Sequence, residues 1–120
     1  MKHALIIEDR MDIALMIEDE LADFGYPSAT IATSQVQAIS LAKRRCPDLI
    51  TADDRLENGS GIAAVRQICD DRAIAVVFIT GDPEHIQEAV PGAVILEKPF
   101  THSGLGRAIS LAIEGARTYR

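Results

Sequence analysis

Residues 47–61 read PDLITADDRLENGSG, and this stretch decides the fold. An apolar run ends at Ala52, two aspartates, Asp53 and Asp54, follow side by side, and a glycine-containing loop comes next. Aspartate is a poor strand former, so we predict that a strand over 48–52 ends just before the pair. Because side chains alternate along a strand, only one of the two aspartates is expected to face a given site.

The bulk composition is that of one ordinary globular domain. The chain has 120 residues, of which 48% are apolar, and its formal net charge is −6. This charge argues against a nucleic-acid surface, because phosphate binding needs clustered positive charge. No apolar run approaches the ~18 residues of a membrane span, no signal peptide is present, and the two cysteines fit no metal spacing. We therefore expect a cytoplasmic domain that binds neither nucleic acid nor membrane.

Short apolar runs alternate with segments of helical periodicity along the whole chain. Five strands are predicted, each followed by a helical segment, over 4–7, 28–32, 48–52, 73–79 and 93–96. This alternation predicts an α/β fold, a doubly wound five-stranded parallel sheet with helices on both faces. In such a sheet, ligands bind beyond the carboxyl ends of the strands.

Side chains able to do chemistry stand at the carboxyl ends of four predicted strands. They are Glu8 and Asp9, Asp53 and Asp54, Thr80, and Lys98. Three carboxylates brought together repel one another unless a cation joins them, and magnesium, which takes hard oxygen ligands, is the natural partner. A hydroxyl and an ammonium suit the oxygens of a phosphoryl group, and a carboxylate can act as a nucleophile. The pattern therefore indicates aspartyl phosphorylation with Mg²⁺ as cofactor.

The sequence resembles the receiver domains of bacterial two-component response regulators over essentially its whole length. Four pieces carry the resemblance in matching order and spacing: IIED at 6–9, PDLITADDRLENGSG at 47–61, VVFITG at 76–81 and EKPF at 97–100. The resemblance implies a flavodoxin-like (βα)5 fold with strand order 2-1-3-4-5. It also implies a phosphoacceptor domain rather than an enzyme, with a sensor histidine kinase or a histidine phosphotransfer protein as its phosphate source.

The resemblance also assigns roles in phosphoryl transfer. In receivers the acceptor lies six residues after the proline of the P-D-L run, and counting from Pro47 gives Asp53. Asp54 is then expected to face solvent or to cap the loop. By the same matching, Thr80 supplies a hydroxyl and Lys98 an ammonium to the phosphoryl group.

The metal ligands follow from the same resemblance. Asp9 and Asp53 are expected to ligate Mg²⁺ directly, Glu8 directly or through water, and Arg55 through its backbone carbonyl. The side chain of Arg55 lies two residues past the acceptor, and Asp82 lies two past the threonine. In receivers these two positions flank the path of the hydrolytic water. Since the two side chains have opposite charge, we expect them to be able to pair across the mouth of the site.

Two departures from the commonest receiver pattern point to a subfamily. Receivers carry an aromatic switch residue three positions before the lysine, and here that position is Ile95. Only residues 81–97 separate the threonine from the lysine, so the fourth helix is expected to be short or degenerate. With VFITGDP at 77–83, the chain is similar to the receivers with an F-A-T-G motif and to those of alphaproteobacterial general stress response regulators.

The leading interpretation is a stand-alone receiver, a single domain over 1–120 with no output domain. It would act on a downstream protein partner as a monomer or weak homodimer. Two alternatives stay open: an unphosphorylated pseudo-receiver that acts only as an interaction module, and a receiver cut from a longer regulator. A haloacid-dehalogenase-type phosphatase is disfavoured, because that class needs two aspartates separated by one residue and Asp53 and Asp54 are adjacent.

Overall fold

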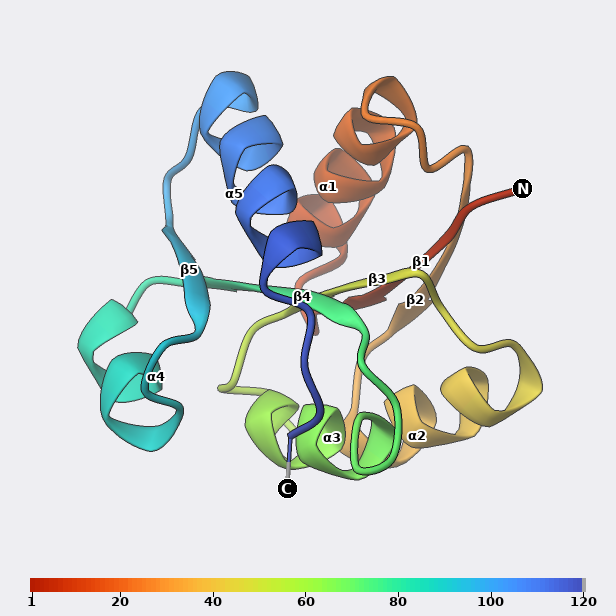
Figure 1. Ribbon diagram of the computed structural model, residues 1–120, viewed down its shortest axis with the longest axis vertical. Coiled ribbons are helices and arrows are strands. Elements are labelled where there is room, and N and C mark those ends of the chain that lie inside the picture. Colours follow the sequence, from red (N-terminus) through yellow and green to blue (C-terminus); the bar gives the residue numbers. More distant parts are fainter. Residues whose placement is uncertain (120) are drawn as a thin grey trace.

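The computed structural model describes residues 1–119 as a parallel sheet between two layers of helices (Figure 1). The strands follow the order β2-β1-β3-β4-β5, and every neighbouring pair is parallel. The predicted fold class and strand order are confirmed. In chain order the elements are β1 (His3–Ile7), α1 (Met11–Asp23), β2 (Ser28–Ala32), α2 (Gln35–Arg44), β3 (Leu49–Ala52), α3 (Gly61–Ile68), β4 (Ala75–Thr80), α4 (Pro83–Ala89), β5 (Val94–Glu97) and α5 (His102–Glu114).

Each face of the sheet has its own apolar core. Helices α1 and α5 cover one face, where Ile17 and Leu105 pack on the sheet, and α2, α3 and α4 lie on the other face (Figure 1). On that second face Val65 and Ile86 contact a core that includes Phe78 of β4. The whole of β4 is buried, as expected for a central parallel strand covered on both sides. No helix within residues 1–119 is long and apolar enough to cross a membrane.

The fourth helix is short, as predicted, but it is regular. Its N-cap is Asp82, whose side chain accepts the His85 amide at 3.3 Å, and Pro83 occupies the first turn, where a missing amide costs nothing. The C-terminal end is held by Arg66, which donates to the carbonyl of Ala89 at 2.7 Å. Helix α4 is therefore attached to its neighbours at both ends.

After α5 the chain crosses from the α1/α5 layer to the α3 side of the sheet (Figure 1). Arg117 forms an isolated bridge with Ile74, just before β4, and donates to the carbonyl of Pro91 at 3.1 Å. The amide of Tyr119 then donates to the carbonyl of Cys69 at 2.9 Å, and the Tyr119 ring is buried in the core on that side. This segment lies at the amino end of the strands, opposite to the predicted site.

Candidate functional site

One ammonium joins two carboxylates at the carboxyl end of the sheet. Lys98 Nζ lies 2.7 Å from Glu8 Oε1 and 2.8 Å from Asp53 Oδ2. These residues follow β5, β1 and β3, so three strand ends position the cluster. The side chains are largely buried, with 2% of Glu8, 14% of Asp53 and 19% of Lys98 exposed. The structure thus brings together three of the predicted site residues, and the Lys98–Pro99 bond is cis.

Burial and charge act against each other in this cluster. Burial raises the pKa of Glu8 above its ordinary value, although the hydrogen bond from Lys98 opposes the change. Burial alone would lower the pKa of Lys98, but its hydrogen bonds to Asp53 and Glu8 outweigh that effect and raise it. The lysine is therefore a fixed positive charge beside the Asp53 carboxylate.

Asp9, the residue after Glu8, is hydrogen-bonded to the loop after β3. Its Oδ2 accepts the backbone amide of Glu57 at 2.7 Å, which ties the end of β1 to the loop after β3. Within residues 1–119, no three acidic, histidine or cysteine side chains already converge as metal ligands. The donor set nevertheless fits magnesium, because this ion needs only one or two carboxylates and completes its shell with water and phosphate oxygens. Glu8, Asp9 and Asp53 supply hard oxygens beside a single ammonium.

Thr80 stands at the end of β4, next to β3, the strand that leads to Asp53. Its side chain is buried, and its Oγ1 accepts the amide of Asp82 at 2.9 Å. Lys98 is tied to the same strand end, because its amide donates to the carbonyl of Thr80 at 2.8 Å.

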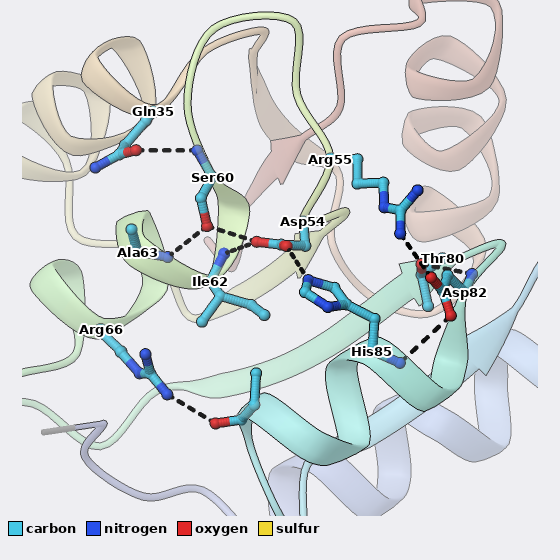
Figure 2. A network of polar contacts seen from close by, with 11 residues as sticks. Gln35, Asp54, Arg55, Ser60, Ile62, Ala63, Arg66, Thr80, Asp82 and His85 are labelled. Carbon is cyan, nitrogen blue, oxygen red and sulfur yellow. Dashed lines mark hydrogen bonds and ion pairs between the residues drawn. The ribbon is translucent and has the colours of Figure 1, made fainter.

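The expected ion pair between Arg55 and Asp82 is present (Figure 2). Nη2 of Arg55 lies 2.8 Å from Oδ2 of Asp82, and 72% of the Arg55 side chain and 43% of the Asp82 side chain are exposed.

Asp54 takes the second of its two expected roles, because its side chain caps the loop and does not face solvent. Only 11% of its side chain is exposed. Its Oδ1 accepts the Ser60 hydroxyl at 2.5 Å and the Ile62 amide at 3.0 Å, and its Oδ2 lies 2.5 Å from Nε2 of His85 (Figure 2). It caps the loop from a buried position because the loop folds over it and α4 covers its second oxygen.

The hydrogen bonds to Asp54 also set its charge. Burial by itself would raise the pKa of this carboxyl, but the bonds from Ser60, the Ile62 amide and His85 outweigh burial and lower it. A carboxylate can only accept hydrogen bonds, so Nε2 of His85 carries the proton between them. His85 and Ser60 were not among the predicted site residues. A serine directly before an apolar helical segment is typical of a helix N-cap, so the sequence could have indicated a role for Ser60. Nothing in the sequence near His85 indicates that its ring reaches the loop after β3.

Gly61 allows the backbone of α3 to approach the Asp53 backbone closely. A Cβ placed on Gly61 would lie 1.8 Å from the carbonyl oxygen of Asp53, whereas a Cβ on Gly81 would meet nothing within 4 Å. Gly61→Ala should therefore lower the free energy of unfolding by about 1–3 kcal/mol, the usual cost of overpacking. Gly81→Ala, also next to a predicted site residue, is the matched control. Urea unfolding measures both, and equal stability of the two variants would contradict the close approach.

Comparison with known proteins shows that the chain is similar in sequence and in structure to response regulators. The chain is 33% identical over 113 residues to the phyllosphere-induced regulator PhyR of Methylorubrum extorquens, covering 91% of this chain but only 42% of that regulator. It is 29% identical to the chemotaxis protein CheY of Thermotoga maritima, covering 91% of this chain and 95% of that protein. The solution NMR structure of the Erythrobacter litoralis PhyR response regulator REC domain superposes with a TM-score of 0.86 at 30% identity, covering 98% of this chain and 93% of that domain.

The family assignment rests on most of the chain. Residues 4–110 match the response regulator receiver domain, and this range includes the strands, apart from His3 at the start of β1, and all of the residues predicted for the site. Receivers are signalling domains of two-component systems. The chain belongs to the response regulator receiver domain family.

Proposed function

We propose that this receiver accepts a phosphoryl group onto Asp53 in a Mg²⁺-dependent phosphorelay, from a sensor histidine kinase or a histidine phosphotransfer protein. The observation that carries the proposal is the Lys98 ammonium 2.8 Å from the Asp53 carboxylate. A fixed positive charge beside a nucleophilic carboxylate is poised to bind the oxygens of an incoming phosphoryl group. Thr80 stands at the neighbouring strand end and can donate its hydroxyl to the same group.

The proposed step is a direct displacement at phosphorus. A carboxylate oxygen of Asp53 forms the new P–O bond while the bond from phosphorus to the donor's histidine nitrogen breaks. Lys98 then pairs with a phosphoryl oxygen. Asp9, Asp53, the Arg55 carbonyl and, directly or through water, Glu8 would hold the metal. Bound Mg²⁺ would neutralise charge on the phosphoryl oxygens.

A small phosphodonor tests this function without any knowledge of the kinase. Incubation of the protein with acetyl phosphate and Mg²⁺ should add one phosphoryl group, seen by intact-mass spectrometry. The label should be lost on treatment with hydroxylamine, which cleaves an acyl phosphate, and should not form in the presence of EDTA. A folded protein that takes no label in Mg²⁺ would instead be a pseudo-receiver.

The output is proposed to be a protein contact. A domain with a net charge of −6 is poorly suited to bind nucleic acid itself, so we infer that its phosphorylation state is read by another protein in the cytoplasm. Its similarity to PhyR and CheY supports a signalling role of this kind. That the domain works on its own, as a monomer or weak homodimer without an output domain, stays a prediction.

The pair formed by Arg55 and Asp82 should lengthen the life of the phosphorylated state by partly covering the path of the hydrolytic water. An exposed pair contributes about 0–1 kcal/mol, so the change in the dephosphorylation rate should be at most about fivefold. The measurement is a double-mutant cycle of hydrolysis rates with Arg55→Ala, Asp82→Ala and the double variant. Each single variant should resemble the double one, whereas strictly additive effects would show that the two residues act separately.

A further inference from the structure

A closed ring of polar contacts joins the loop after β3 to the first turn of α4. Two adjacent loop residues each contact this turn: the carboxylate of Asp54 contacts the imidazole of His85 at 2.5 Å, and the guanidinium of Arg55 contacts the carboxylate of Asp82 at 2.8 Å. The ring closes within α4, because the other oxygen of Asp82 accepts the backbone amide of His85 at 3.3 Å. Figure 2 shows these four residues together.

The loop side of this ring lies in the predicted phosphorylation site. Asp54 stands between Asp53, the proposed acceptor, and Arg55, whose carbonyl is a proposed metal ligand. Its buried carboxylate therefore anchors the backbone from which both groups reach the site. Two of its partners, Ser60 and the Ile62 amide, lie at the end of the same loop and the start of α3.

The third partner of Asp54 comes from elsewhere in the fold. His85 is 31 residues away in the chain, and it fixes the Asp54 oxygen that the loop leaves uncovered. Since the carboxylate is charged and largely buried, this hydrogen bond is of the strong, charge-assisted kind. The position of the Asp53–Arg55 backbone thus depends on where α4 lies.

We propose that His85 is a positioning residue for phosphoryl transfer, one that holds the acceptor loop in its reactive arrangement through Asp54. The inference rests on the proposed function of Asp53. It makes α4 part of the reactive structure, so that a displacement of this helix changes the reactivity of the acceptor. Helix α4 has other attachments, with Ile86 buried in the core and Arg66 bound to the carbonyl of Ala89, so loss of the His85 ring should not undock the helix.

The test compares initial rates of phosphorylation by acetyl phosphate in saturating Mg²⁺ for a set of His85 variants. His85→Ala should react about fivefold more slowly than wild type, equivalent to ~1 kcal/mol of transition-state stabilisation. His85→Gln should restore most of the rate, because its side-chain amide can place a donor where Nε2 lies. His85→Asn, which is one carbon shorter, should stay slow. Gln87→Ala, at an exposed position on the same helix, is the matched control and should react at the wild-type rate.

A second readout does not depend on phosphorylation. The Ile62 amide donates to Asp54, so its hydrogen exchange should be faster in His85→Ala than in wild type and should be slowed again in His85→Gln. A wild-type rate in His85→Ala, or a His85→Gln variant as slow as His85→Ala, would overturn the positioning role while leaving Asp53 as acceptor. A wild-type protein that takes no label would overturn the proposed function and, with it, this role.

Discussion

Asp53→Asn should abolish labelling of this receiver by acetyl phosphate, whereas Asp54→Asn should keep most of it. An amide in place of the Asp53 carboxylate is a far weaker nucleophile, and it removes the charge that pairs with Lys98 at 2.8 Å. Asp54 points the other way, into the contact with Ser60 and His85. Intact-mass spectrometry after a fixed reaction time measures both variants.

The asparagine at position 54 is chosen so that its hydrogen bonds survive. Its side-chain oxygen can accept from Ser60 and Ile62 as the carboxylate does, and its NH₂ group can donate to a neutral His85 ring. Loss of label in Asp54→Asn, with label retained in Asp53→Asn, would show that the register at the end of β3 is off by one residue. Circular dichroism of both variants confirms that the fold is kept.

Lys98→Met should produce the largest loss of stability among these variants. It would leave Glu8, with 2% of its side chain exposed, as a buried carboxylate that has lost its cation and still faces Asp53. Breaking a buried ion pair by removing one partner typically costs about 3–5 kcal/mol. The measurement is urea unfolding at about pH 7 in EDTA, so that no divalent ion replaces the lysine. Lys98→Arg keeps the positive charge, so its free energy of unfolding should fall much less than that of Lys98→Met.

The loss should depend on pH in a definite direction. Burial already raises the pKa of Glu8 in the folded protein, and removal of the Lys98 ammonium raises it further. The folded state then binds a proton more readily than the unfolded state, so the unfolding free energy of Lys98→Met should recover as the pH falls from about 7 toward 5. A Glu8→Gln/Lys98→Met double variant should be more stable than Lys98→Met at pH 7. Equal stability of these two variants would show that the Glu8 charge is not the cause.

The sequence was sufficient to predict the part of the site that is built from residues at the ends of strands. Hydrophobic runs located the strands, and a parallel sheet gathers their carboxyl ends at one edge, so the meeting of Glu8, Asp53 and Lys98 followed from topology. The pairing of Arg55 with Asp82 could also be predicted, because Arg55 lies two positions past Asp53 and Asp82 lies two positions past Thr80, at the ends of neighbouring strands. Residues this close to the end of a strand have little freedom in where their backbone can lie, because the strand itself is fixed in the sheet.

Side-chain partners farther from the sheet could not be predicted in this way. The contact between His85 and Asp54 depends on how a two-turn helix is rotated and how closely it packs, which Ile86 and Arg66 decide through tertiary contacts. The burial of Asp54 depends in turn on the path of the loop over it. Neither feature has a periodic pattern in the sequence, and a polar residue after a strand is most often exposed.

The return of the chain across the amino end of the sheet determines where a label on residues 117–119 would lie. Arg117 and Tyr119 anchor that end beside β4 and α3, while Asp53 lies at the opposite end of the strands. A fluorescent label attached to residues 117–119 would therefore lie on the side of the molecule away from Asp53, the proposed acceptor. Because Arg117 also binds the carbonyl of Pro91, two residues after the end of α4, such a label would lie near the C-terminal end of the helix whose His85 contacts Asp54.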